Sequence, residues 1–407
     1  MAVGVWGAGR EIRSLAAELA GRLPSARIAV VASDEPLDDA VLPEARRVTG
    51  EAVAGALAAC DVVVRSPGVS MYRPELAEVR ARGVAVTTAT ALWLAETGGA
   101  RVIGVTGTKG KSTTAALILH LLSAAGRPAR LAGNIGVPAL DLLSRPDDEL
   151  SVVELSSYQI ADLEVGPEVA VITNLYPEHV DWHGSVEAYR ADKLRLLGLP
   201  GVSARVLCAR DPLLRAEAAT AWYGEPDGWD VTAAGVAFHG ETAVAAADLP
   251  LLGEHNALNL CAALAAVAAA GVPVPDLPAG LEGFAALPHR LEVVSDQGGV
   301  IWVDDSISTT PESALAALQS FADRGVVLIA GGQDRGQDYA ALGRELAARE
   351  AVVIGLPETG ARLLDAARRA GVPDERARAA GGMGAAVAVA ERVAVAGSGV
   401  LLSPAAP

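Results

Sequence analysis

The fold of this chain is set by the stretch Gly104-Val105-Thr106-Gly107-Thr108-Lys109-Gly110-Lys111-Ser112-Thr113-Thr114. Residues 101–103, just before it, are typical of a short buried strand, and residues 115–122 are apolar at helical spacing. A strand that runs through glycines into a helix presents backbone N–H groups and a helix N-terminus to a phosphate chain. The pattern therefore predicts a phosphate-binding loop, in a variant form because Val105 occupies the place of the usual first glycine.

The last residues of this loop suit a nucleoside triphosphate. Lys111 can reach the terminal phosphates, and the hydroxyl of Ser112 or Thr113 can ligate Mg²⁺. A plain glycine-rich turn before an ordinary helix is the alternative, and it does not account for the Lys-Ser-Thr sequence.

Lysine is rare in this chain: only three of the 33 basic residues are lysines. Lys109 and Lys111 lie in the predicted loop, and the third is Lys193. An amine can lose its proton and act as a nucleophile, whereas a guanidinium stays protonated. Lys193 is therefore a candidate for chemistry, although a surface lysine retained by chance would look the same in the sequence.

Size and composition limit the classes of function. A chain of 407 residues predicts two or three domains, and a hydrophobic content of 51% with few aromatic residues is typical of an α/β protein. The net charge of -16 argues against a nucleic-acid partner. The three cysteines form neither a disulfide nor a zinc pattern, and no apolar stretch is long enough to span a bilayer. We therefore expect a soluble, cytoplasmic enzyme that does not associate with membranes. We also expect a monomer, although composition does not determine the oligomeric state.

The N-terminal part, residues 1–97, predicts a small parallel α/β unit with strands at 2–6, 28–32 and 61–64. Gly7 and Gly9 follow the first strand, but Ile12 stands where a dinucleotide-binding turn has its third glycine, so NAD binding is disfavoured. A phosphate-binding first turn is the more cautious interpretation. The loop Ser66-Pro67-Gly68 is expected on the same carboxyl edge of the sheet.

The central part, residues 98–286, places polar residues at two further strand ends. The strand at 150–155 contains Glu154, and the strand at 170–173 runs into His179. A carboxylate at a strand end beside a phosphate loop is a natural Mg²⁺ ligand, so Glu154 and His179 are predicted ligands. Farther on, Asn256 and Asn259 share one helical face, and their spacing favours a helix cap over a nucleotide contact.

The C-terminal part, residues 287–407, predicts a third α/β unit with strands at 300–303, 326–329 and 351–354. Polar residues crowd the ends of two of these strands, at 304–310 and 331–335.

Taken in order, these segments resemble the Mur ligases, cytoplasmic enzymes that build the peptide stem of peptidoglycan. The resemblance spans the whole chain and rests on the segments 66–68, 106–114, 133–136, 154–159, 255–256, 288–290 and 401–404. It implies a Rossmann-like UDP-sugar-binding domain, a central ATP-binding P-loop domain and a Rossmann-like amino-acid-binding domain, with the boundaries given above. It also implies a further loop and helix beyond Pro407, which this sequence does not contain.

Within the family, the motifs most resemble those of the enzymes that add glutamate to UDP-N-acetylmuramoyl-L-alanine. The enzymes that use D-glutamate usually carry a lysine in a segment similar to Asp-Ser-Lys-Ala-Thr-Asn and a Gly-Lys-Ser-Gly-like first turn. This chain has Ile307 in place of that lysine and Gly9-Arg10-Glu11 in the first turn. With the segment 174–184, these differences favour the L-glutamate branch, and D-glutamate is the alternative.

The resemblance also implies roles for individual residues. Those that would hold ATP are Gly107, Thr108, Lys109, Gly110, Lys111, Ser112, Thr113, Asn256, Arg290 and Asp305. Those that would ligate Mg²⁺ are Ser112, Glu154, His179 and a carbamylated Lys193. Those that would contact the UDP-sugar or glutamate are Ser66, Pro67, Gly68, Asn134, Ser156, Arg335 and Ser403. Lys111, Lys193, His179 and Glu154 would be catalytic, in a reaction that passes through an acyl phosphate.

Two other classes remain as alternatives. A folylpolyglutamate synthase has a similar loop but lacks a domain with a Ser66-Pro67-Gly68-like segment. A P-loop switch protein would bind a nucleotide to control a partner and would not need a carbamylated lysine.

Overall fold

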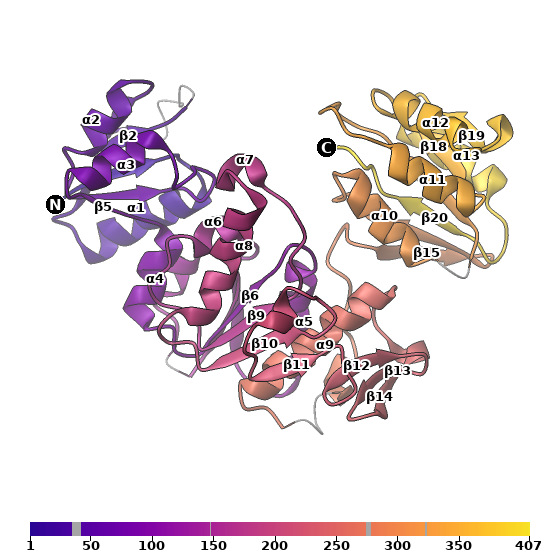
Figure 1. Cartoon of the computed structure of the whole chain (residues 1–407), viewed down its shortest axis with the longest axis horizontal. Helices are drawn as coiled ribbons and strands as arrows, with labels where there is room; N and C mark the ends of the chain where they lie inside the picture. Colours follow the sequence, from indigo (N-terminus) through magenta and orange to yellow (C-terminus); the bar gives the residue numbers. More distant parts are fainter. Residues whose placement is uncertain (35–41, 147, 274–277, 322–323) are drawn as a thin grey trace. The chain divides into compact units, whose positions relative to one another are not determined.

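The computed structural model describes residues 1–34, 42–146, 148–273, 278–321 and 324–407. In these residues the strands form three sheets, of five, nine and six strands (Figure 1). The predicted α/β fold is confirmed. The chain divides into two compact units, Met1–Ala247 with Leu258–Glu282 and Asp248–Ala257 with Gly283–Pro407. The boundaries expected at residues 97 and 286 stay predictions.

The first sheet is parallel, in the order β3-β2-β1-β4-β5. Its strands are β1 (Ala2–Trp6), β2 (Arg27–Ala32), β3 (Arg46–Val48), β4 (Val62–Arg65) and β5 (Ala85–Thr87). Its helices are α1 (Arg10–Arg22), α2 (Ala52–Leu57), α3 (Pro74–Ala81) and α4 (Ala89–Thr97). Since β1 and β4 are parallel neighbours, the loops that follow them lie on one edge, and Ser66 N donates to Trp6 O at 2.7 Å.

The second sheet contains the phosphate loop, and its order is β14-β13-β12-β11-β10-β9-β6-β8-β7. The strands are β6 (Val102–Thr106), β7 (Ala129–Gly133), β8 (Leu150–Glu154), β9 (Val169–Ile172), β10 (Ala204–Cys208), β11 (Ala221–Tyr223), β12 (Trp229–Thr232), β13 (Gly235–Phe238) and β14 (Glu241–Ala245). The helices are α5 (Lys111–Ala124), α6 (Ser157–Ile160), α7 (Val180–His183), α8 (Val186–Leu194) and α9 (Glu254–Ala269). β12, β13 and β14 form an antiparallel extension that the sequence analysis did not predict.

The predicted strand and helix around the phosphate loop are confirmed as β6 and α5. Every residue of β6 is buried, as expected for a central parallel strand. α5 packs on β6, β7 and β8, and its inward side includes Ala115, Ile118 and Leu122. The loop between them is therefore supported by a continuous core.

The third sheet has the order β15-β16-β20-β17-β18-β19, in which only the β15–β16 pair is antiparallel among the described strands. The strands are β15 (Glu292–Gln297), β16 (Val300–Asp304), β17 (Val326–Ala330), β18 (Val352–Gly355), β19 (Ala377–Ala379) and β20 (Gly399–Leu402). The helices are α10 (Pro311–Gln319), α11 (Ala340–Ala348), α12 (Gly360–Arg369) and α13 (Met383–Val393).

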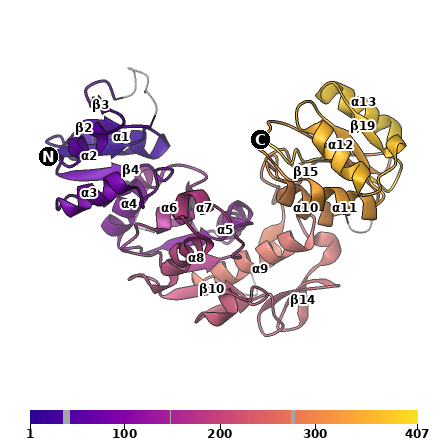
Figure 2. The ribbon, with the colours of Figure 1, turned by 45° about the horizontal axis from the view of Figure 1, so that its top comes forward.

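Helices cover both faces of this third sheet (Figure 2). Side chains alternate along a strand, so Val326 and Leu328 pack with α10, α11 and α12, whereas Val327 and Ile329 pack with α13. The continuous apolar sequence of β17 follows from this double burial. Among the described residues, no helix combines the length and the apolar character needed to cross a membrane.

Candidate active site

Three parallel strands of the second sheet bring the candidate residues to one edge. β6 lies between β8 and β9, with Val105 opposite Glu154 and Thr106 opposite Ile172. The loop after β6 therefore lies between Glu154 and the segment that follows β9. The carboxyl edge of a parallel sheet is where α/β proteins bind ligands.

The phosphate loop requires its glycines. Gly107 has φ +144° and Gly110 has φ +84°, both in the left-handed region that favours glycine. A Cβ at Gly107 would clash with Thr173 Oγ1, and one at Gly110 would clash with Asn259 Oδ1. The loop is also fixed from outside, because Thr108 N donates to Asn174 O at 2.9 Å.

The two lysines of the loop differ in their surroundings. Lys111 Nζ donates to Thr108 O at 2.9 Å, so its ammonium is folded over the loop. Lys109 Nζ pairs with Glu178 Oε1 at 2.8 Å on the surface. Burial alone would raise the pKa of Glu178, but Lys109 holds that pKa below its usual value. Glu178 was not predicted as a site residue. Its carboxylate contacts both Lys109 of the loop and the imidazole of His179.

Glu154 joins two of the predicted binding elements. Its side chain lies in the interior, with 1% of the residue exposed. Ser112 Oγ donates to its Oε2 at 2.6 Å, and Asn134 Nδ2 donates to its Oε1 at 2.8 Å. One carboxylate therefore connects the N-terminus of α5 to the turn that follows β7.

Lys193 is inside the protein rather than on its surface, with 2% exposed. Its Nζ donates to Gly107 O at 2.8 Å and to Thr106 Oγ1 at 3.2 Å. Burial, and then the charge of Lys111, lower the pKa of Lys193 well below its usual value. A larger fraction of this amine is therefore neutral near pH 7, and the neutral amine is the form that reacts with CO2.

His179 follows β9 in a left-handed conformation, with φ +56°, and α7 begins at the next residue. Burial lowers the pKa of His179, which favours the neutral imidazole, the form that can donate a lone pair to a metal. Its Nε2 lies 3.5 Å from Glu178 Oε2. Among the described residues, the one group of three His, Cys, Asp or Glu side chains with converging ligand atoms is His289, Glu292 and Asp304, in the second unit.

The predicted UDP-sugar residues lie on two loops of the first unit. The Ser66 hydroxyl oxygen is buried and, within the described part of the chain, has no hydrogen-bond partner. A buried hydroxyl without a partner is unusual in a folded protein, and a bound ligand would supply the missing hydrogen bond. Ser156 is different, because it caps α6 and exchanges hydrogen bonds with Gln159. Its side chain is already engaged within the protein.

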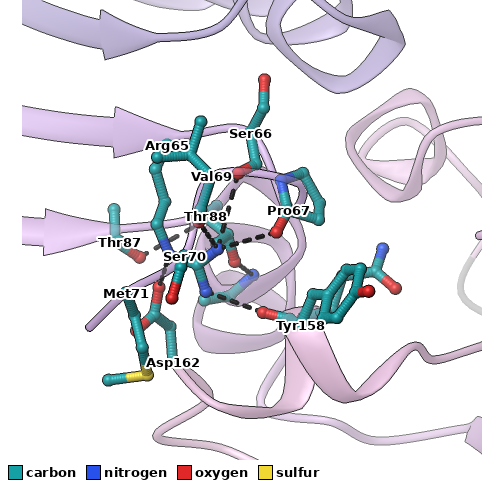
Figure 3. Close-up of polar contacts among 12 residues, drawn as sticks. Arg65, Ser66, Pro67, Val69, Ser70, Met71, Thr87, Thr88, Tyr158 and Asp162 are labelled. Carbon is teal, nitrogen blue, oxygen red and sulfur yellow. Dashed lines mark hydrogen bonds and ion pairs between the residues drawn. The ribbon is translucent and has the colours of Figure 1, made fainter. Parts of the chain in front are cut away.

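Two arginines that the sequence analysis did not assign connect these loops to the second sheet. Arg10 donates to the carbonyls of Gly133 at 2.8 Å, Asn134 at 3.1 Å and Gly136 at 2.7 Å. Arg65 donates to Tyr158 O at 2.7 Å and to Asp162 Oδ2 at 2.5 Å (Figure 3). The only sequence signal for Arg65 is a charged residue that ends the otherwise apolar strand β4.

The predicted residues of the second unit form contacts of their own. Asp305 Oδ2 accepts hydrogen bonds from Ser308 Oγ at 2.6 Å and from Ser403 Oγ at 2.9 Å, and burial raises the pKa of Asp305. Ser403 is buried, and the hydrogen bond from its hydroxyl holds the carboxylate of Asp305 in place. Arg335 Nη2 donates to Gln333 Oε1 at 3.2 Å.

Asn256 and Arg290 complete this set in the second unit. Because α9 begins at Glu254, Asn256 is not its N-cap, and the cap interpretation is wrong. The Asn256 Nδ2 donates to Leu252 O at 2.8 Å. The Arg290 backbone N–H donates to Leu287 O at 3.1 Å.

Family models place this architecture among known proteins. Residues 105–267 match the Mur ligase middle domain, and residues 289–406 match the Mur ligase glutamate ligase domain. The chain belongs to the Mur ligase family. This confirms the predicted family and the prediction that the chain is an enzyme, an ATP-dependent ligase that forms an amide bond.

Curated relatives of this Mur ligase are similar over most of their length. It is 45% identical to the UDP-N-acetylmuramoyl-L-alanine–L-glutamate ligase of a Micromonospora species, over 100% of this chain and 92% of the relative. It is 42% identical to the enzyme of the same name from Xanthomonas axonopodis pv. citri, over 85% of this chain and 77% of the relative.

Solved structures agree on the fold. The UDP-N-acetylmuramate–alanine ligase of Thermotoga maritima matches with a TM-score of 0.58 at 18% identity, over 100% of this chain and 96% of that one. A MurF ligase from the same organism, solved in complex with ADP, matches with a TM-score of 0.55 at 18% identity, over 95% of this chain and 88% of that one. The three-domain Mur ligase architecture is thereby confirmed.

Proposed function

We propose that this Mur ligase joins L-glutamate to UDP-N-acetylmuramoyl-L-alanine at the expense of ATP, a step of peptidoglycan precursor synthesis. The observation that carries the proposal is the meeting of the phosphate loop, the Ser112–Glu154 pair and the buried Lys193 at one sheet edge. The names of the relatives support the choice of substrates.

We assign UDP-sugar binding to residues 1–97, ATP binding to residues 98–286 and amino-acid binding to residues 287–407. Residues 107–113 hold the ATP phosphates through backbone N–H groups and Lys111. Asn256, Arg290 and Asp305 contact the nucleotide, and Arg335 places glutamate.

The donor set fits Mg²⁺. Ser112 and Glu154 supply a hydroxyl and a carboxylate that are already within hydrogen-bond distance of each other. A neutral His179 adds a nitrogen ligand. The Lys193 amine adds to CO2 and releases one proton, and the resulting carbamate is an oxygen ligand that arginine cannot form. When bound, Mg²⁺ offsets negative charge on the phosphoryl oxygens.

The reaction has two chemical steps. An oxygen of the terminal alanine carboxylate attacks the γ-phosphorus of ATP, ADP leaves, and an acyl phosphate forms. The amine of glutamate then attacks the acyl carbon, and the tetrahedral intermediate expels phosphate as the amine loses its proton. Lys111 offsets charge on the transferred phosphoryl group. Ser66 and Asn134 hold the UDP-sugar so that its carboxylate faces that group.

Ile307 supports the L-isomer. It occupies the position at which the D-glutamate enzymes that this chain resembles carry a lysine, and 46% of it is exposed. An uncharged side chain there removes a cation that would otherwise attract a carboxylate. The relatives named above are also L-glutamate ligases.

An isotope experiment tests the mechanism. UDP-N-acetylmuramoyl-L-alanine labelled with ¹⁸O in the alanine carboxylate should transfer one ¹⁸O to the released phosphate for each amide formed. Unlabelled phosphate would contradict the acyl phosphate. ADP formation at the same rate without the UDP-sugar would instead favour a nucleotide switch.

A further inference from the structure

The side chain of Arg65 is completely buried, with 0% exposed, at the end of β4. Its guanidinium donates through all three nitrogens (Figure 3). The acceptors are Asp162 Oδ2 at 2.5 Å, Tyr158 O at 2.7 Å, Val69 O at 2.8 Å, Pro67 O at 3.2 Å and Ser66 O at 3.4 Å. Arginine suits this task because its planar fork presents several donors in fixed directions.

These acceptors fall into two groups. The carbonyls of Ser66, Pro67 and Val69 belong to the loop that follows β4 itself. Tyr158 lies in α6, and Asp162 follows α6, on the unit's second sheet. One side chain therefore fixes the shape of the loop and attaches it to the elements at the edge that carries Glu154.

The Ser66 hydroxyl is not part of this set. Figure 3 shows it directed away from the Arg65 guanidinium, although its backbone carbonyl faces that group. Because the carbonyls of the loop face the buried cation, the Ser66 hydroxyl lies on the other side of the loop, where it is buried and has no hydrogen-bond partner among the described residues. The Arg65 contacts thus set the direction in which Ser66 can donate.

α7 and α8 also hold this loop and the residues that follow it. Trp182 Nε1 donates to Pro67 O at 3.1 Å, and Ser70 Oγ donates to Trp182 O at 2.7 Å. Tyr72 donates its hydroxyl to Asp192 Oδ2 at 2.8 Å. Asp192 precedes Lys193 on α8. Two elements that hold this loop therefore also position the predicted metal ligands.

Stability alone does not explain why this interior contains the ion pair between Arg65 and Asp162. A buried ion pair recovers little more than the cost of removing its two charges from water, and a well-packed apolar pair is often as stable. The carbonyl contacts, in contrast, depend on the guanidinium and would be lost with it. They specify one conformation of the loop.

We propose that Arg65 is a positioning residue that, anchored by Asp162, holds the Ser66–Val69 loop in the orientation that binds the diphosphate of the UDP-sugar. The inference rests on the function proposed above. Arg65 acts through the loop and does not itself contact the substrate.

The decisive variant is the double substitution Arg65→Met with Asp162→Leu, which removes both charges together and leaves neither buried alone. Arg65→Lys is the second variant, since an ammonium can keep the pair with Asp162 but cannot span the carbonyls. Arg82→Lys is the matched control, because Arg82 pairs with Glu78 on the surface of the same sheet's helix layer. Melting temperature and circular dichroism establish that each variant is folded.

We expect the KM for UDP-N-acetylmuramoyl-L-alanine to rise about 10- to 100-fold in the folded Arg65 variants, a range typical of residues that orient a binding group. The KM for ATP and the kcat at saturating UDP-sugar should change less than about twofold, and Arg82→Lys should match the wild type. The amides of residues 66–70 should exchange faster with deuterium in the Arg65 variants.

A folded variant with the wild-type KM for the UDP-sugar and unchanged exchange would overturn the inference. A wild-type protein that does not bind the UDP-sugar would overturn the proposed function instead. The exchange measurement separates the two failures, because it needs no substrate.

Discussion

Replacing Lys193 with alanine tests the carbamate and its place in the site. The substitution removes Cγ, Cδ, Cε and Nζ, together with any group attached to the nitrogen. Because Lys193 is buried, the substitution leaves a cavity among its neighbours. The lost methylenes cost about 0.8 kcal/mol each, or about 2.5 kcal/mol in all. The cavity adds to this cost, whereas removal of an amine whose lowered pKa shows that its charged form is disfavoured there reduces it.

The expected loss of activity is larger than the loss of stability. One preorganised charged group that acts on the reacting phosphoryl group contributes about 3–4 kcal/mol to the barrier, so kcat should fall about 10²- to 10³-fold. Release of ADP at saturating substrates measures it, and urea unfolding shows that the variant remains folded.

Small molecules can then replace the missing atoms. The four carbons of pentanoate before its carboxylate take the places of Cγ, Cδ, Cε and Nζ, and its carboxylate takes the place of the carbamate. Propylamine instead reproduces Cγ, Cδ, Cε and Nζ of the unmodified lysine. We predict that, in CO2-free buffer, pentanoate restores activity at least about tenfold and propylamine does not. Pentanamide, which has the same shape without charge, is the control. Rescue by propylamine, or wild-type activity in Lys193→Ala, would refute the reasoning.

Further predictions concern the neighbouring residues. Glu154→Gln should raise the Mg²⁺ concentration needed for half-maximal activity about 10- to 100-fold, measured by metal titration. Gly107→Ala should abolish ATP binding, measured by calorimetry, because the added Cβ would clash with Thr173. Gly126→Ala is the control: Gly126 also has a positive φ, but a Cβ there would meet no other atom, so this variant should bind ATP normally. The lowered pKa of Lys193 means that the unfolded state binds the proton of this amine more readily than the folded state does. In CO2-free buffer, the free energy of unfolding of the wild type should therefore rise with pH relative to that of Lys193→Met. The rise should occur between the lowered pKa and the ordinary value of about 10.4. A pH-independent difference would contradict the burial of the amine.

Local sequence predicted the strand and the helix around the phosphate loop correctly. This was possible because glycines, a buried strand and an apolar helix face lie within about twenty residues. Glu154 was predicted from its strand end, and the parallel neighbours of β6 bring it to the loop. The scarcity of lysine drew attention to Lys193, and its burial is consistent with that interest.

Contacts between distant segments were not predictable in the same way. Arg65 and Asp162 are 97 positions apart, and nothing in either segment specifies the other. The antiparallel strands β13 and β14 have only four and five residues, and β14 is mostly exposed, so neither shows a strong alternating pattern. Asn256 was assigned as a cap because spacing gives a shared face but does not give the residue at which a helix begins.

The central claim is tested most directly by phosphate release with ATP, Mg²⁺ and UDP-N-acetylmuramoyl-L-alanine, with L-glutamate compared with D-glutamate. The account predicts release with the L-isomer, at least about a hundredfold faster than with the D-isomer at equal concentration, and an amide product of matching amount. Release that depends on D-glutamate alone would contradict the assigned isomer. No release with either isomer would contradict the proposed ligation itself.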